Sequence, residues 1–126
     1  MKNFKKYFLL PAPPSDVYLA LTNPKSISLW SGDLAEMSDV PGSEFSLWDG
    51  SIVGKNLEFE TDKKIVQQWY FGDTPDVSIV TIKLHTKGEE TSVEVNQTNI
   101  PDEDFTDIVE GWNNSYIAGL EEFFRE

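Results

Sequence analysis

The stretch "VEGWNNSYIAGLEEFF", residues 109–124, carries the pattern that decides the fold. Its apolar residues recur every three to four positions, as they do on one face of an amphipathic α-helix. We expect one long helix over residues 102–126 whose apolar face consists of Phe105, Ile108, Val109, Trp112, Tyr116, Gly119, Leu120 and Phe123.

Two glycines interrupt this helix, although a glycine in a helix interior costs about 1 kcal/mol relative to alanine. Gly119 lies within the apolar face, and Gly111 lies toward its flank. The missing side chain at Gly119 allows either a close approach between the helix and a sheet or an empty space above the sheet. The first alternative is packing and the second is a pocket.

The residues before this helix alternate between apolar and polar with a period of two, which is typical of strands that have one buried face. The Asp49-Gly50 pair is a strong hairpin signal. We expect, in chain order, a strand over 3–11, short helices over 11–24 and 25–32, a weak strand over 33–39, a hairpin over 43–60, and strands over 63–73, 76–86 and 91–99. The alternation directs to the buried face Phe45, Leu47, Val53, Leu57, Phe59, Ile65, Gln67, Trp69, Phe71, Val80, Ile82, Leu84, Val93, Val95 and Gln97.

This order predicts a single α+β domain over residues 1–126. About six to seven strands joined by short turns form an antiparallel, curved sheet, with two short helices after the first strand. The one long amphipathic helix has to bury its face on the one available sheet. A curved sheet around a helix leaves room for a pocket between the two.

The composition limits the classes of partner. The chain has 22 Asp and Glu against 10 Lys and Arg, so its formal net charge is −12. A surface this acidic repels nucleic acid and anionic membranes, which leaves solubility or a basic protein partner as its interpretation. There is no run of about 20 apolar residues, so we expect no membrane span. The absence of cysteine agrees with a cytoplasmic protein, which is what we expect. We also expect a monomer or a weak dimer.

The sequence contains no recognisable catalytic motif. His85 is the one histidine and is expected on the outer face of a strand, so neither a metal site nor a catalytic triad is predicted. The acidic run over 102–104 complements the positive end of the helix dipole. We therefore predict no catalytic residue, no metal and no cofactor.

The aromatic content supports either an ordinary core or a ligand pocket: the chain has four Trp, four Tyr and eight Phe. Gln67, Gln97 and Tyr116 place polar groups on faces predicted to be buried, where they need hydrogen-bond partners. They would bond to one another, to a buried water or to a ligand in an apolar pocket. The candidate pocket residues are Trp30, Phe45, Leu57, Phe59, Gln67, Trp69, Phe71, Val80, Ile82, Val95, Gln97, Trp112, Tyr116 and Gly119.

Three motifs carry a resemblance to a known family: "LTNPKSISLW" at 21–30, "FSLWDGSIVGK" at 45–55 and "EGWNNSY" at 110–116. With their spacing, the chain resembles the activator of heat shock protein 90 ATPase homologue family, within the START/Bet v 1-like (SRPBCC) superfamily. The resemblance covers nearly the whole chain. One departure is Thr74-Pro75, where we expect a tryptophan before the proline, which predicts a less apolar loop at that strand end.

The resemblance implies the helix-grip fold and no catalytic motif. Relatives across the superfamily bind apolar small molecules between sheet and helix, and some are cyclases or hydroxylase components. In the eukaryotic co-chaperone, a domain like this one is the C-terminal half and works with a separate N-terminal domain, for which we expect no counterpart in these 126 residues.

Three functional hypotheses follow. The main one is a non-enzymatic binding protein with an apolar pocket for a small molecule or lipid. The alternative is a protein that binds a heat-shock chaperone and resembles the C-terminal domain of the ATPase activator. A weaker alternative is a cyclase or hydrolase-like enzyme that uses the same pocket.

Overall fold

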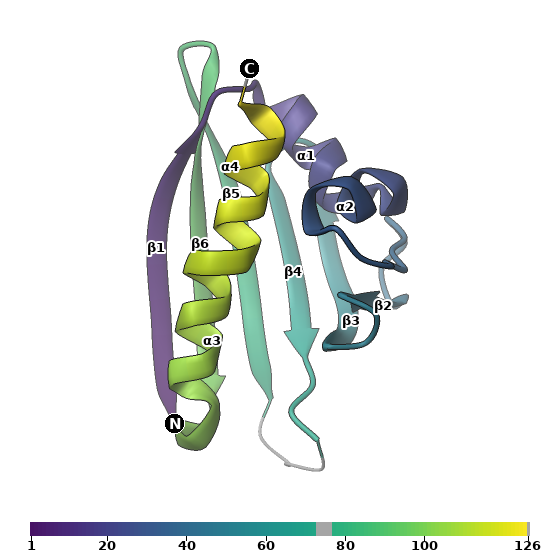
Figure 1. The fold of residues 1–126 in the computed structure, drawn as a ribbon, viewed down its shortest axis with the longest axis vertical. Coiled ribbons are helices and arrows are strands. Elements are labelled where there is room, and N and C mark those ends of the chain that lie inside the picture. The colour runs from purple at the N-terminus through teal and green to yellow at the C-terminus, as the bar shows by residue number, and fades with distance from the viewer. Residues whose placement is uncertain (73–76, 126) are drawn as a thin grey trace.

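The computed structural model describes residues 1–72 and 77–125. The departure at Thr74-Pro75 lies outside the described residues. Figure 1 shows one sheet with its helices on a single face and the long C-terminal helix running diagonally across that face. The described elements are β1 Lys2–Leu10, α1 Pro14–Thr22, α2 Pro24–Ser31, β2 Glu44–Leu47, β3 Ile52–Glu60, β4 Lys64–Trp69, β5 Ser78–Lys87, β6 Glu90–Ile100, a 3-10 turn Asp102–Asp104, α3 Phe105–Gly111, a π-helical segment Trp112–Tyr116, and α4 Ile117–Phe124.

The sheet has six strands in the order β1-β6-β5-β4-β3-β2, and every neighbouring pair is antiparallel. The first strand therefore closes one edge beside the last strand, and the β2–β3 hairpin forms the other edge. The predicted α+β helix-grip architecture is confirmed, with two short helices after the first strand.

Local chemistry defines the two short helices. Pro14 starts α1, where the missing N–H of proline is not needed. The side chain of Asn23 caps α2 by accepting a hydrogen bond from the backbone N–H of Ser26 at 3.1 Å. Gly32 ends α2 with φ of +76°, a left-handed conformation that glycine adopts without strain.

The predicted weak strand over 33–39 is wrong. This segment makes only an isolated bridge between Glu36 and Ser46. Asp33 Oδ1 accepts a hydrogen bond from the N–H of Leu34 at 2.8 Å. Such side chain to backbone hydrogen bonds compete with strand pairing and favour a turn.

The inward residues of β3 also differ from the prediction. Val53 and Leu57 were expected on the buried face, yet they are 37% and 38% exposed. Gly54 and Asn56 are buried in their place, and the register between β3 and β4 shifts between Asn56 and Glu58. A β-bulge adds one residue and reverses the alternation, so Phe59 again packs against the core.

The long helix is continuous but not uniformly α-helical. Its turn at Trp112–Tyr116 is π-helical, and this wider turn rotates the residues that follow it. Ile117 is therefore buried at 3% exposure, although the regular period did not select it. The prediction that Phe123 lies on the buried face is wrong, since it is 39% exposed and Phe124 packs against the core instead.

Candidate ligand groove beside the long helix

All four tryptophans and Tyr116 meet in one cluster between the long helix and the sheet. The rings of Trp69 and Trp112 are stacked, with centroids 5.1 Å apart and planes 14° from parallel. Tyr116 lies 4.4 Å from Trp112 and 4.9 Å from Trp30 between ring centroids. Trp48 completes the cluster at 5.8 Å from Tyr116.

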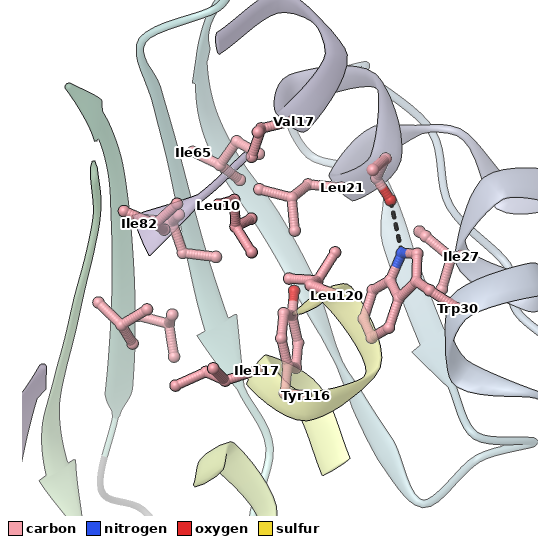
Figure 2. Packing of buried hydrophobic residues seen from close by; sticks show 14 of the residues in the cluster. Leu10, Val17, Leu21, Ile27, Trp30, Ile65, Ile82, Tyr116, Ile117 and Leu120 are labelled. Carbon is pink, nitrogen blue, oxygen red and sulfur yellow. Dashed lines mark hydrogen bonds between the residues drawn. The ribbon is translucent and has the colours of Figure 1, made fainter. Parts of the chain in front are cut away.

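Tyr116 and Trp30 connect this aromatic cluster to the rest of the hydrophobic core. Figure 2 shows Tyr116 beside Leu120 and Trp30, with the indole of Trp30 bonded back to α1. That hydrogen bond runs from Trp30 Nε1 to the carbonyl of Ala20 at 2.8 Å. Burial raises the pKa of the Tyr116 phenol above its ordinary value, because the charged phenolate would lose its solvation there.

The two buried glutamines accept from tryptophans of the cluster. Trp69 Nε1 donates to Gln67 Oε1 at 3.1 Å, and Trp112 Nε1 donates to Gln97 Oε1 at 2.8 Å. The amide of Gln67 in turn donates to Asn56 Oδ1 at 2.9 Å. Among the described residues the two glutamines do not bond to one another; their partners are Trp69 and Asn56 for Gln67, and Trp112 and Ser78 for Gln97.

A groove opens along α3, where the helix stands off the β2–β3 hairpin. Its volume is about 420 Å³. Its lining consists of Asp33, Trp48, Ser51, Ile52, Trp69, Asp107, Ile108, Gly111, Trp112, Ser115 and Tyr116. Apolar walls with a few polar groups at the rim are typical of small-molecule sites, whose volumes run from about 300 to 1,000 Å³.

Three of the predicted pocket residues line this groove: Trp69, Trp112 and Tyr116. The others lie elsewhere. Leu57 is exposed, and Phe59 and Phe71 are partly buried at the edge of the core. The remaining predicted residues are enclosed in the packed interior or its polar network: Trp30, Phe45, Gln67, Val80, Ile82, Val95 and Gln97, with Gly119 packed on α2.

The two glycines of the helix have different surroundings, one packed and one open. A Cβ on Gly119 would lie 2.7 Å from the carbonyl oxygen of Trp30 and 3.1 Å from Cε3 of its ring. Gly119 therefore permits the helix to pack directly on α2, and no void lies there. A Cβ on Gly111 would meet none of the described residues within 4 Å, and Gly111 lines the groove.

Sequence reasoning missed the hairpin wall of the groove. Trp48 and Ile52 flank the Asp49-Gly50 turn, and the strand alternation did not direct either of them inward. Trp48, just after the end of β2, has a φ of +50°, which is unusual for an aromatic residue. This backbone conformation turns its side chain away from the direction that the strand alternation would give.

The outer face of the sheet is polar. His85 is 48% exposed there, which confirms its predicted surface position, and its Nε2 lies 2.9 Å from Glu94 Oε1. That hydrogen bond holds the pKa of the Glu94 carboxyl below its usual value, with Lys5 and Lys83 acting in the same direction. A wider hollow of about 870 Å³ nearby has charged side chains of both signs in its lining: Glu60, Asp62, Lys63, Lys64 and Lys83.

In residues 1–72 and 77–125, no group of three or more His, Asp or Glu side chains is placed to hold a metal ion. Within the same ranges, no helix has the length and apolar character needed to cross a bilayer.

Comparison with known proteins identifies the relatives of this chain. An activator of 90 kDa heat shock protein ATPase homologue from Dictyostelium discoideum is 31% identical over 114 residues, which is 88% of this chain and 30% of that protein. The human activator homologue 1 is 25% identical over 113 residues, again 88% of this chain and 33% of the relative. This chain therefore spans about a third of the length of these two curated relatives.

Solved structures agree in fold. The crystal structure of an HSP90 activator from Plasmodium falciparum superimposes with a TM-score of 0.88 at 27% identity, covering 96% of this chain and 94% of that one. The sequence profile of the family described as "Activator of Hsp90 ATPase homolog 1-like protein" matches residues 11–125. With its fold, its motifs and this match in agreement, the chain belongs to the Activator of Hsp90 ATPase homolog 1-like family.

Proposed function

We propose that this protein binds a heat-shock chaperone of the 90 kDa class and changes the rate of its ATPase. The observation that carries the proposal is the similarity to the Plasmodium HSP90 activator, which extends over 96% of this chain and 94% of that one. The relatives from Dictyostelium and human also bear the activator name, and each of the two alignments covers 88% of this chain.

The charge of the protein supports an electrostatic contribution to this association. A net charge of −12 makes encounter with a basic surface faster and sensitive to ionic strength. At 0.15 M salt the Debye length is about 8 Å, so contacts between exposed charges weaken as salt rises.

The test is an ATPase assay with the 90 kDa chaperone of the same host, combined with a binding measurement at several salt concentrations. We expect a changed turnover rate and an affinity that falls as salt increases. An unchanged rate together with no salt-sensitive association would refute the proposal. Human serum albumin, another acidic protein, is the control for a nonspecific charge effect on the assay.

A second candidate function is the binding of an apolar small molecule in the groove. The specific observation in its favour is an aromatic hollow of about 420 Å³ kept open at Gly111. Native mass spectrometry of protein purified from its own host, together with calorimetric titration of aromatic and lipid ligands, tests it. Absence of both bound mass and saturable heat would exclude this function, while Gly111→Leu is the matched variant in which the groove is filled.

A further inference from the structure

We propose that the groove and the solvent-facing side of α3 together form the docking surface for a basic segment of the chaperone, in which Lys or Arg side chains flank one large apolar side chain. The inference rests on the proposed chaperone function, since it names the surface of this chain that is used and the chemistry of the partner segment. Three properties of the surface support it: carboxylates without ion pairs on the helix, charge of one sign around them, and an accessible apolar hollow beside them.

The first property is an acidic stripe along the start of the long helix, formed by Glu103, Asp107 and Glu110, all exposed. Asp107 lies one helical turn after Glu103, and Glu110 lies one turn after Asp107. Like charges at these spacings destabilise a helix. In residues 1–72 and 77–125, none of the three forms an ion pair. The helix therefore carries a repulsion that nothing described within this chain relieves.

The second property is the sign of the charge around the stripe. Residues 101–124 include seven Asp and Glu and no Lys, Arg or His. Across the groove from α3, Asp33 on the loop after α2 adds another carboxylate, and no described Lys, Arg or His lines the groove. Lys2 lies over the ring of Phe105, and Lys6 donates a hydrogen bond to Asn113, but neither lysine lines the groove. The surface is complementary to a basic partner, and an acidic one would be repelled.

The third property is an apolar hollow that begins at the stripe, since Asp107 also lines the groove. The accessible apolar part of the lining consists of three partly buried residues, Trp48, Ile52 and Ile108. Gly111 lies beside them, and its missing side chain leaves space for a side chain of a partner. The rings beneath are enclosed and support this hollow without offering much surface of their own: Trp69, Trp112 and Tyr116.

The two parts of the surface have complementary roles. At protein–protein interfaces an apolar side chain that fills a pocket contributes most of the affinity, and the charged groups around it set orientation and the rate of encounter. With a volume of about 420 Å³, the groove has room for one large apolar side chain. Lys or Arg side chains on either side of that residue would reach the stripe and Asp33, and would relieve the repulsion along the helix.

The test measures the affinity of the full chain for the 90 kDa chaperone of the same host at several salt concentrations. Asp107→Lys combined with Glu110→Lys reverses the charge of the stripe. The matched control is Glu89→Lys combined with Glu121→Lys, which changes the net charge equally at exposed residues outside the groove. These two lie in the β5–β6 turn and on α4, at the opposite end of the molecule from the start of α3 (Figure 1).

We expect the stripe variant to bind about tenfold more weakly and with a flatter salt dependence, because two exposed attractions become repulsions. The control variant should bind within about twofold of the unchanged protein, since salt screens charges that lie far from the interface. Equal losses in the two variants would show a general charge effect and overturn the inference.

Gly111→Leu tests the apolar part of the surface without changing any charge. It should fill the hollow and weaken binding by about tenfold while the salt dependence stays the same, because a buried apolar side chain of the partner is displaced. Thermal unfolding checks that every variant is folded. Unchanged affinity of this variant would overturn the role of the groove.

The remaining outcomes separate this inference from the function on which it rests. If the unchanged protein binds the chaperone and neither the stripe variant nor Gly111→Leu weakens binding, the docking surface lies elsewhere: the inference fails and the chaperone function stands. If the unchanged protein does not bind the chaperone at any salt concentration, both fail.

Discussion

The two halves of the long helix contain the same unfavourable residue in opposite surroundings. In α4, Gly119 is pressed against α2, and an added Cβ would lie 2.7 Å from the carbonyl oxygen of Trp30. In α3, Gly111 faces the groove, where an added Cβ would meet none of the described residues within 4 Å. One glycine is therefore explained by packing, whereas the packing of the protein gives no reason for the other.

The difference arises at the π-helical segment between the halves. Trp112–Tyr116 adds one residue to a turn, and such insertions occur frequently at functional sites. The segment directs Trp112, Tyr116 and Ile117 inward together, at 1%, 4% and 3% exposure. The helix thus places its largest side chains at the junction, with a packed half on one side and a groove on the other.

The largest effect should come from filling the packed half. Gly119→Leu would push a side chain into the backbone of α2, and overpacking of this kind costs about 3 kcal/mol. Chemical denaturation of this variant and of Gly111→Leu measures the contrast directly. A free energy of unfolding for Gly119→Leu equal to or above that of the unchanged protein would show a void at Gly119 and contradict the difference between the two glycines.

The junction itself should be next in sensitivity. Trp112→Phe removes the donor to Gln97 Oε1, leaving a buried acceptor unpaired at a cost of about 2 kcal/mol. Trp69→Phe is the matched variant, and it should cost less because its bond to Gln67 is longer, at 3.1 Å against 2.8 Å, and joins two residues of one strand rather than the helix to the sheet. Equal free energies of unfolding for the two variants would contradict the structural role assigned to the hydrogen bond between Trp112 on the helix and Gln97 on β6.

The open half should respond in the opposite direction. Gly111→Ala adds a better helix former without a clash, so we expect a gain of up to about 1 kcal/mol in stability. Thermal unfolding measures this gain. A loss of stability would mean that the space above Gly111 is smaller than the structure shows.

The smallest effect should lie on the outer face of the sheet, away from both halves. The pKa of Glu94 is lowered from 4.5, chiefly by the hydrogen bond from His85, so its contribution is present above that pH and lost as the pH falls. Glu94→Gln should reduce stability by about 0.5 kcal/mol at pH 7 and by less at pH 3. Denaturation at the two pH values tests this, and a larger loss of stability at pH 3 than at pH 7 would contradict the predicted direction of the pH dependence.

The overall fold could be predicted because its signals are regular. The strands of β5 and β6 alternate without interruption, and Val80, Ile82, Val93 and Val95 are all buried as expected. The Asn23 cap and Gly32 bound the second helix at residues that the sequence already marks. Regular periods and capping residues depend on local chemistry, which a single sequence contains.

The candidate site was predicted only in part, because irregularities of the backbone shape it. The β-bulge reverses the side chains after Asn56, and the π-helical turn changes which residues after Tyr116 face inward. Neither feature alters hydrophobic periodicity enough to be recognised beforehand. Trp69 was identified by the regular alternation of β4, and Trp112 and Tyr116 were identified by the helical period, which holds up to the π-helical turn.

The gathering of every tryptophan into one cluster also determines how the protein absorbs and emits light. Because the rings of Trp69 and Trp112 are stacked 5.1 Å apart, their electronic transitions are coupled, and excitation passes readily among the four indoles. The tryptophan part of the near-ultraviolet spectrum is therefore a signal from a single place, the contact between helix and sheet. Loss of that contact would change the tryptophan spectrum even while strands β5 and β6 remained paired with each other.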